Sequence, residues 1–523
     1  MEERRLRSSE SFVAGVAAMV VALAVFGVAH LVQASAPFPP LGLAQRALHL
    51  VPGALAVFFV ERLGHLALRL FAVGFTVGSV LAGGAAGVLV GRRPSRSRVA
   101  AGWLAALALA VLAAGGYRTQ PGGLSLAAFL LLDAAAAAAW AFTLRGAMDR
   151  LQRDPVPTPA SGFARTRREL LRAALGAGAL LGIGLVARRM VGGLGDQGGR
   201  PLQRPVGATL RPAPAAPEAN AEDAAFQAIK GLTPEVTANR HHYTVDESII
   251  DPNIDAGSWR LKLTGLVARP TQLSYQDLLG MPAVEQYVTL QCISNLIGGD
   301  LVSTAKWTGV PLRAVLERAG GLKPGAVRVV FHAVGGYTDS LPVAKALAPT
   351  TVVAYGMNDR SLPRAHGYPA RIIVPGIYGM KNVKWLERIE VVDYDYRGYW
   401  QRSDGWDNLA VIKTASRIDV PADPAVRGPA TIAGLAWAGD RGIRRVEVSM
   451  DGGRSWTPAI LRRELARAAW RQWRLPWRPA SSGRVTLEVR AVDGRGVVQT
   501  SRLAPPHPSG ASGYQQVEVV VDA

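Results

Sequence analysis

The chain has 523 residues, of which 49% are hydrophobic and 19% charged, and it carries a formal net charge of +20. This length corresponds to roughly three domains of about 100–200 residues each, and the apolar fraction excludes intrinsic disorder as the main state. The single cysteine excludes a disulfide framework, a zinc site built from several cysteines and an iron–sulfur cluster held by four thiolates.

The positive charge is unevenly distributed. Residues 1–200 hold 21 Arg and no Lys against 9 Asp and Glu, and these arginines lie between apolar segments. Such a pattern is typical of a membrane domain with several spans. The basic residues after position 200 are scattered and form no RNA- or DNA-binding motif, so we expect no nucleic-acid partner.

Five apolar segments are candidates for membrane helices, because about 20 apolar residues cross the hydrocarbon core as a helix. They are Ser11–Ser35, Leu70–Gly91, Val99–Tyr117, Thr119–Leu144 and the shorter Ala173–Ala187. Most arginine clusters fall on the cytoplasmic side if Leu41–Leu68 lies on the outer surface as an amphipathic helix. We predict a membrane domain over residues 1–190 with about five spans. Asp133, inside a span, is either a functional residue or part of a helix interface.

The last predicted span begins with two adjacent arginines. Residues 166–172 (TRRELLR) resemble a twin-arginine export signal in an internal position, and they are equally well explained as the basic flank of an ordinary span. Both interpretations place everything after Val191 outside the cytoplasm. Residues 191–232 are rich in Gly, Pro and Ala without periodicity and are interpreted as a linker.

The remaining sequence predicts two domains of different texture. Residues 233–420 combine short strands with short helices such as Pro311–Ala319, which indicates an α+β domain. Residues 421–523 contain only strands and turns and fit a β-sandwich. The expected strands are Trp259–Thr264, Glu285–Gln291, Val327–Ala333, Val352–Tyr355, Arg371–Val374, Ala430–Leu435, Ile443–Met450 and Val485–Val492.

Two motifs in the α+β domain carry residues suited to chemistry. Cys292 ends an apolar strand and opens a glycine-containing loop, a position where a soft thiolate can bind a metal. A lone cysteine is otherwise a buried, inert side chain. The second motif, residues 366–386, places His366 and Arg371 at one end of a strand and a Gly/Lys loop at the other. Arg, Lys and glycine backbone can bind phosphate, although a solvated basic loop explains the same pattern.

These motifs resemble the sulfite oxidase family of molybdopterin-dependent oxidoreductases. The resemblance rests on residues 290–295 (LQCISN) with 306–312 (KWTGVPL), and on HGYPARIIVPGIYG at 366–379 with KWL at 384–386. It covers residues 233–420, and the family's C-terminal domain, an immunoglobulin-like sandwich that often dimerises, corresponds to 421–523. It implies a membrane-anchored bacterial enzyme that transfers an oxygen atom at a molybdenum centre on one molybdopterin.

The resemblance also assigns roles by position. Cys292 corresponds to the thiolate ligand of molybdenum, and Arg240 is the one residue that could replace a substrate-binding arginine near Asn239. The predicted cofactor contacts are Asn239, His242, Tyr243, Cys292, His366, Arg371, Gly379, Met380, Lys381 and Lys384. The adjacent His241 and His242 do not suggest zinc, because neighbouring side chains in an extended segment point in opposite directions.

The pattern departs from the sulfite-oxidising members on the substrate side. Their arginine five residues after the cysteine corresponds here to Ile297, and their active-site tyrosine falls at residues 404–406, where no tyrosine occurs. Sulfite is therefore a poor candidate, and the methionine sulfoxide reductase branch is a comparison; we expect a small sulfur- or nitrogen-containing substrate.

Electrons must leave or arrive through another carrier. No haem-binding domain is apparent, so we expect a separate redox partner, either a cytochrome or a quinone-linked membrane protein, and a possible homodimer through residues 421–523. Two other functions stay open: a cysteine hydrolase or transpeptidase with Cys292 as nucleophile and His366 as base, and a binding protein without cofactor.

Overall fold

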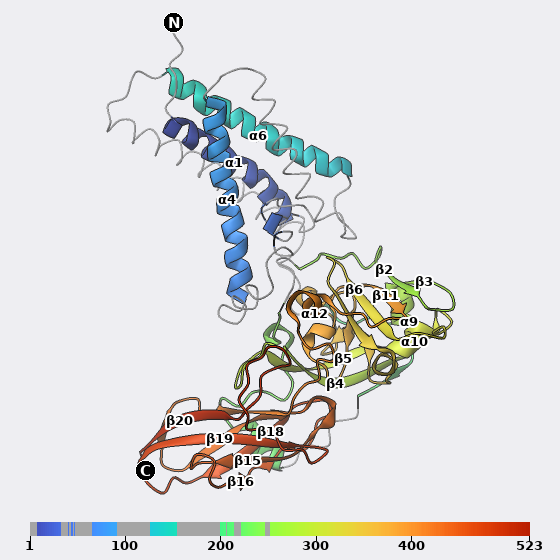
Figure 1. Cartoon of the computed structure of the whole chain (residues 1–523), viewed down its shortest axis with the longest axis vertical. Helices are drawn as coiled ribbons and strands as arrows, with labels where there is room; N and C mark the ends of the chain where they lie inside the picture. Colours follow the sequence, from blue (N-terminus) through green and yellow to red (C-terminus); the bar gives the residue numbers. More distant parts are fainter. Residues whose placement is uncertain are drawn as a thin grey trace. The chain divides into compact units, whose positions relative to one another are not determined.

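The computed structural model describes residues 8–32, 40, 43–44, 47, 65–91, 126–153, 199–205, 207–213, 221–245 and 251–522. The chain forms two compact units, one of Met1–Gly195 with Asp246–Asp255 and one of Asp196–Val245 with Ala256–Ala523 (Figure 1). Each unit is described by itself below.

The first unit contains three long helices, α1 (Ser8–Val32), α4 (His65–Gly91) and α6 (Leu126–Arg153), and each is long and apolar enough to cross a membrane. The helices α1 and α4 meet backbone to backbone, because a Cβ on Gly15 would lie 2.9 Å from the Cα of Gly87. Small residues permit such close approach of helices in a membrane.

Three of the five predicted spans are thus confirmed as apolar helices. The predicted spans 99–117 and 173–187 and the twin-arginine motif lie outside the described residues, as does most of Leu41–Leu68. Their topology stays a prediction.

The second unit is β-rich and begins with two mixed sheets. The first has the order β1-β4-β5-β8-β10 with β9 paired to β8, and the second has the order β3-β2-β11-β6-β7. Only the β1–β4 and β11–β2 pairs are parallel. The strands are β1 (Leu210–Arg211), β2 (Arg260–Gly265), β3 (Thr271–Ser274), β4 (Ala283–Gln291), β5 (Val302–Pro311), β6 (Arg328–Ala333), β7 (Thr338–Pro342), β8 (Val352–Met357), β9 (Arg360–Ser361), β10 (Arg371–Ile373) and β11 (Leu386–Val392).

Short helices join these strands. They are α8 (Ala221–Gln227), η1 (Asn239–His241), α9 (Tyr275–Gly280), α10 (Leu312–Glu317), α11 (Val343–Ala346), η2 (Arg364–His366), η3 (Gly379–Lys381) and α12 (Tyr399–Asp404). The start of α9 has a reciprocal cap, in which Ser274 Oγ accepts from Asp277 N and Asp277 accepts from Ser274 N. The core of the first sheet includes Trp307, Leu290 and Ile373.

The C-terminal part consists of two further sheets, with the orders β12-β14-β18-β17 and β13-β20-β19-β15-β16, joined by η4 (Gly439–Arg441). Residues of both sheets, such as Ile432, Trp473 and Val489, belong to one buried cluster, so the sheets pack face to face. The strands are β12 (Ala415–Val420), β13 (Ala425–Arg427), β14 (Ala430–Trp437), β15 (Ile443–Ser449), β16 (Thr457–Pro458), β17 (Ile460–Leu461), β18 (Arg471–Trp477), β19 (Gly483–Asp493) and β20 (Gln515–Asp522).

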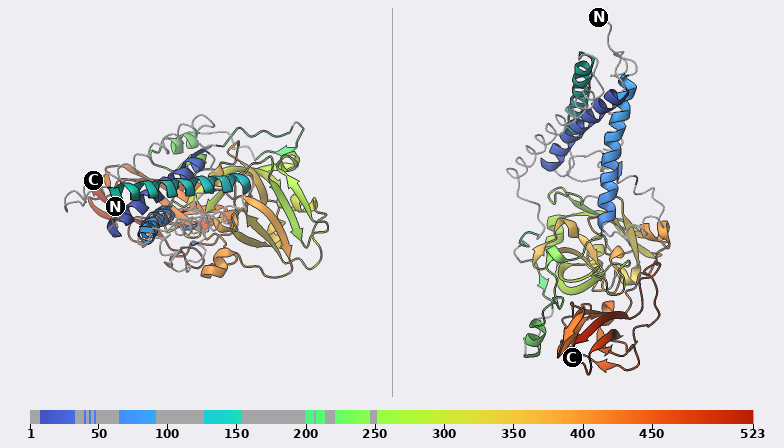
Figure 2. Two further views of the ribbon diagram at one scale, coloured as in Figure 1. Left: turned by 90° about the horizontal axis from the view of Figure 1, so that it is seen from above. Right: turned by 90° about the vertical axis from the view of Figure 1, so that its left-hand side faces the viewer.

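Parts of the predicted linker pack on these domains. Strand β1 pairs in parallel with β4, and Arg204 Nη2 donates to the carbonyl of Met281 at 3.2 Å. The helix α8 lies beside the C-terminal strands (Figure 2), where Asp223 accepts from Arg462 at 2.9 Å. The Gly/Pro/Ala-rich segment is therefore mostly irregular, but its described residues form hydrogen bonds with both domains.

Candidate active site

Cys292 follows the last residue of β4 and opens a loop that closes on itself. Its backbone N–H donates to Leu301 O at 2.9 Å, and the side chain of Asn295 accepts from Leu301 N at 3.0 Å. The Cys292 side chain is half-buried, with Sγ 3.0 Å from Ser294 Oγ. Burial raises the pKa of the thiol above its ordinary value. The backbone thus fixes where the sulfur sits at the end of a rigid strand.

The C-terminal sheets hold this strand and loop in place. Gln291 Oε1 accepts from Trp437 Nε1 at 2.8 Å, and both residues are buried. Further contacts join Trp470 N to Thr289 Oγ1 at 2.7 Å and Arg417 Nη1 to Gly299 O at 2.9 Å. The residues on both sides of Cys292 are therefore bonded to the neighbouring domain.

Two buried tyrosines lie within electrostatic reach of Cys292. Burial raises the pKa of Tyr378 to about 12 and that of Tyr243 well above its ordinary value, and the nearby thiol adds to both shifts. Gly379 packs closely against one of these tyrosines: a Cβ there would be 2.6 Å from Tyr243 Oη and 3.3 Å from Gln291 O. Only glycine allows the Tyr243 hydroxyl and the carbonyl before Cys292 to come this close to the backbone.

Next to the tyrosines, four basic side chains form what we name the cationic cluster: His242, His366, Arg371 and Lys384. The rings of His242 and His366 are 5.1 Å apart. Burial, followed by the charge of Arg371, lowers the pKa of His366 to about 4, and burial followed by His366 lowers that of His242 well below its ordinary value. Both imidazoles are therefore neutral near pH 7.

The two cations of the cluster are held by backbone carbonyls and aromatic rings. Arg371 donates to His366 O at 3.1 Å and to Asn382 O at 2.9 Å, and its Cζ is 5.1 Å from the Trp307 ring centroid. Lys384 Nζ donates to Ala365 O at 3.2 Å, and burial lowers its pKa to about 7. Burying positive charge among carbonyls favours an anionic ligand, because an anion compensates the lost hydration.

The other predicted site residues have more varied surroundings. Asn239 is buried, donates to Met357 O at 3.2 Å and accepts from Asn358 Nδ2 at 2.7 Å. Its own carbonyl lies 3.0 Å from His366 Nε2, so it touches the cationic cluster. Arg240 is exposed and donates to His241 Nε2 at 3.2 Å, a contact that does not bring it to the Cys292 loop.

The helix η3 places Met380 and Lys381 differently from each other. The carbonyl of Met380 accepts from Tyr337 Oη at 2.8 Å. Lys381 is fully buried, and its Nζ donates to Asp339 Oδ1 at 2.6 Å and to Ser340 O at 3.0 Å. The Asp339 carboxylate neutralises the buried Lys381 ammonium, so this ion pair holds the Gly379–Lys381 turn in position.

Four exposed apolar side chains come from the Cys292 loop and from segments that contact its neighbours, and we name Leu296, Leu409, Val411 and Leu503 the apolar rim. Each is at least 47% exposed. Leu296 belongs to the Cys292 loop, and Val411 bridges to Ile377, which precedes Tyr378. A Cβ on Gly513 would approach both Leu503 and Ile297, so the loop before β20 also lies close to the Cys292 loop.

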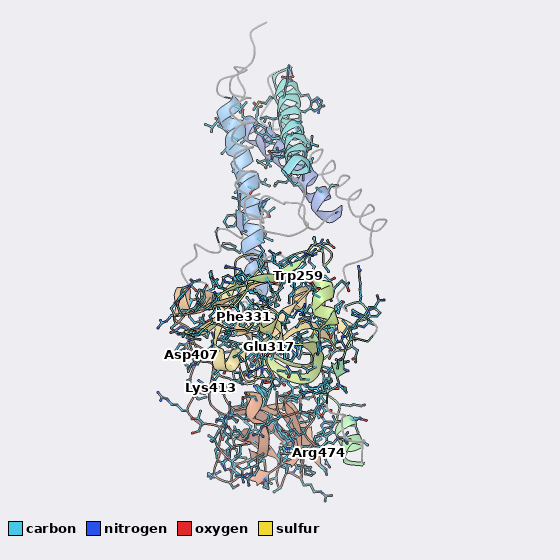
Figure 3. All side chains as sticks on the ribbon, turned by 90° about the vertical axis from the view of Figure 1, so that its right-hand side faces the viewer. Trp259, Glu317, Phe331, Asp407, Lys413 and Arg474 are labelled. Carbon is cyan, nitrogen blue, oxygen red and sulfur yellow. The ribbon has the colours of Figure 1, made fainter. Side chains whose placement is uncertain are left out.

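Some residues near the thiol were missed by sequence reasoning. Tyr378 lies in a motif that the resemblance quotes without a role, and Lys413 comes from the loop before the C-terminal sheets, where its N–H donates to Tyr378 Oη at 3.4 Å. Figure 3 shows Lys413 and Asp407 at the junction of the two domains. No sequence pattern joins these distant segments; a tyrosine beside a glycine-rich turn was the one available signal.

Family models match most of this unit. An "oxidoreductase molybdopterin binding domain" matches residues 248–400, and a "Mo-co oxidoreductase dimerisation domain" matches residues 408–504. The chain is 34% identical to mitochondrial sulfite oxidase of Macaca fascicularis over 49% of this chain and 55% of that protein. It is 33% identical to sulfite oxidase of Gallus gallus over 52% of this chain and 69% of that protein.

Other matches are more distant. Nitrate reductase [NAD(P)H] of Hordeum vulgare is 32% identical over 41% of this chain and 30% of that protein. A crystal structure of the sulfane dehydrogenase SoxCD from Paracoccus pantotrophus is 25% identical over 56% of this chain and 82% of that chain, with a TM-score of 0.48. The chain spans about half the length of most of the mammalian relatives it matches.

The fold and site define a molybdenum-cofactor oxidoreductase. The chain belongs to the sulfite oxidase family of molybdopterin-dependent enzymes, as its motifs predict, and this membership implies Mo-molybdopterin as cofactor. The matched dimerisation domain suggests a homodimer. Family membership favours the oxidoreductase over the hydrolase alternative.

The residues present fit such a cofactor. Among the described residues, the buried Nε2 of His242 has no hydrogen-bond partner, so it is free to bond a ligand. The buried cations of the cluster suit a large, hydrogen-bonding anion. No group of three or more His, Cys, Asp or Glu gathers as a metal site in the described part of the chain.

Proposed function

We propose that this chain is a membrane-anchored enzyme that transfers an oxygen atom to or from a small sulfur- or nitrogen-containing substrate at the extracytoplasmic face. The observation that carries the substrate class is the apolar rim together with Ile297, in the place where the family's sulfite-oxidising members have arginine. An anion at this rim would lose hydration without gaining a counter-charge, whereas a neutral sulfoxide or N-oxide would lose less.

The roles of the site residues follow from their surroundings. Cys292 supplies the thiolate for molybdenum, and His242, His366 and Arg371 hold the pterin with Asn239. Lys384 provides the charge for the cofactor phosphate, because its pKa of about 7 would rise towards full protonation beside an anion. The ion pair of Lys381 with Asp339 positions the loop of Gly379 and Met380.

The bound group would supply a metal that changes by two electrons and exchanges an oxygen atom. The protein binds and orients: Tyr243 and Tyr378 are protonated at neutral pH and can donate hydrogen bonds beside the thiolate. Arg240, exposed on η1, is the candidate to donate a hydrogen bond to the oxygen of an incoming neutral substrate. The apolar rim limits water near the sulfur.

We further propose the domain boundaries 1–190, 191–232, 233–420 and 421–523, with an immunoglobulin-like topology in the last domain. The three apolar helices support membrane anchoring. A separate cytochrome or quinone-linked protein would exchange the electrons, since the single cysteine excludes an iron–sulfur cluster of the usual kind.

The test begins with molybdenum per chain, measured by elemental mass spectrometry on the detergent-purified full chain from a host that makes molybdopterin. We expect about one equivalent, as one thiolate binds one metal. Sulfite, methionine sulfoxide and trimethylamine N-oxide are then assayed with an artificial electron carrier. Turnover of a neutral oxide with little turnover of sulfite supports the proposal; efficient sulfite oxidation contradicts the substrate class.

A further inference from the structure

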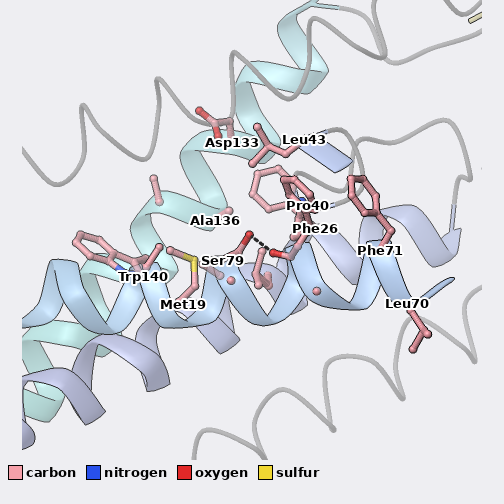
Figure 4. A pocket seen from close by; sticks show the side chains of 17 residues that line it. Met19, Phe26, Pro40, Leu43, Leu70, Phe71, Ser79, Asp133, Ala136 and Trp140 are labelled. Atoms are coloured by element: carbon pink, nitrogen blue, oxygen red, sulfur yellow. Dashed lines mark hydrogen bonds between the residues drawn. The ribbon is translucent and has the colours of Figure 1, made fainter. Parts of the chain in front are cut away.

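The three described helices of the first unit line an open cavity of about 660 Å³ (Figure 4). Its walls come from residues 19–26 of α1, 70–82 of α4 and 133–140 of α6, together with Pro40 and Leu43. Phe26, Phe71 and Trp140 give it aromatic walls. The volume is typical of sites for small organic ligands, which range from about 300 to 1,000 Å³.

The helix packing explains why space opens here. Beyond the cavity, α1 and α4 touch through Gly15 and Gly87. Along the cavity, α4 presents Gly74 and Gly78, and a Cβ at either position would meet nothing within 4 Å. Glycines that no neighbour crowds leave room for a ligand, whereas the first pair of glycines brings the helices together.

One polar group in the cavity wall is unsatisfied. Asp133 is 2% exposed, and its Oδ2 is buried without a hydrogen-bond partner in the described part of the chain. Trp140 Nε1 is likewise buried without a partner there. A buried polar group without a hydrogen bond is unfavourable in an apolar site, so a ligand that offers both a donor and an acceptor would satisfy these two groups on α6.

We propose that this cavity binds an isoprenoid quinone or its quinol. A quinol hydroxyl would donate to the Asp133 carboxylate, a ring oxygen would accept from Trp140, and the ring would pack against the phenylalanines. A phospholipid fits poorly, because its phosphate would face the Asp133 carboxylate and its tails would leave both polar atoms unpaired. This inference rests on the proposed membrane anchoring, and it adds to the enzyme its own site for a membrane electron carrier.

The probe is decylubiquinone, as quinone and as quinol, titrated by equilibrium binding into phosphatidylcholine nanodiscs that hold the full chain. Gly78→Leu fills the cavity from α4. Gly146→Leu is the matched control, since a Cβ at Gly146 on α6 also meets nothing within 4 Å and this glycine does not line the cavity. Asp133→Asn keeps the size of the side chain and removes its charge.

We expect one quinol per chain, binding at least about 10-fold weaker in Gly78→Leu, unchanged in Gly146→Leu and at least about threefold weaker in Asp133→Asn. Equal affinity of Gly78→Leu and the unmodified chain would overturn the proposal, as would absence of binding or displacement of the quinol by cholesterol.

Two further measurements separate this result from the proposed enzyme function. Molybdenum per chain in the same samples reports on the soluble active site, whereas retention of the chain in carbonate-washed membranes reports on anchoring. One molybdenum without quinol binding would reject the cavity proposal alone, and loss from the washed membranes would reject anchoring together with the cavity.

Discussion

The cationic cluster and the apolar rim differ in polarity. The cationic cluster buries two positive charges and two neutral imidazoles, each held by a backbone carbonyl or a ring. The apolar rim exposes four aliphatic side chains. This difference fits two kinds of ligand. The cationic cluster suits a large anion that stays bound, as a cofactor does, and the apolar rim suits a neutral substrate that binds and dissociates in each turnover.

The largest expected effect comes from removing the Cys292 thiol. Cys292→Ser should lower turnover by at least about 100-fold, because even residues that only support a metal ligand cost about 10–100-fold when mutated. Pterin per chain should stay near that of the unmodified protein, since the cationic cluster remains. Parallel loss of pterin and activity would show that the thiolate also retains the cofactor.

Weakening the cationic cluster should act on the cofactor. Arg371→Gln should reduce pterin occupancy by about 10-fold or more at limiting cofactor, because it removes a buried charge and two hydrogen bonds. Arg313→Gln, an exposed arginine that donates to Leu347 O, is the control. Equal occupancy in the two variants would exclude Arg371 as a cofactor contact.

Adding a charge to the substrate side should change which substrate is used. Ile297→Arg should raise kcat/KM for sulfite by about 10-fold, which corresponds to about 1.4 kcal/mol of transition-state stabilisation. Ile297→Gln controls for polarity without charge and should leave sulfite turnover low. A higher rate with both variants would mean that the polarity of this side chain, and not its charge, limits sulfite turnover.

A last effect, on stability rather than on turnover, concerns pH and the chain without cofactor. The pKa of His366 is lowered to about 4, so an unfolded chain binds more protons than the folded one between pH 6.5 and 4. The free energy of unfolding should therefore fall as the pH drops from 6.5 to 4, and His366 contributes up to about 3 kcal/mol to this fall. Urea unfolding of the apo chain, followed by tryptophan fluorescence, measures it; His366→Gln should flatten the profile.

Local patterns predicted many elements of the fold. Strands β4, β6, β8, β14, β15 and β19 lie where alternation and turn residues indicate them, and α10 (Leu312–Glu317) lies within the predicted helix Pro311–Ala319. Strand β18 was missed, because Pro476 within a run argues against a strand. Strand β1 was missed because two residues in a Pro/Gly-rich segment carry no periodic signal.

The candidate site was predictable only through its motifs. They place His366 and Arg371 together, but they do not reveal that Lys381 pairs with Asp339, which lies 42 residues earlier in the chain. The contacts of Tyr378 with Lys413 and of Gln291 with Trp437 join segments 35 and 146 residues apart. Such pairings depend on the packing of whole domains, which no local spacing encodes.

The hydrogen bond between Trp437 and Gln291 makes the C-terminal domain a structural partner of the thiol next in sequence to Gln291. A change at a subunit interface formed by these sheets could therefore reach the metal through one side chain. A chimera that takes its C-terminal half from a relative should therefore keep its fold yet hold Cys292 less firmly, unless that half has a tryptophan at position 437.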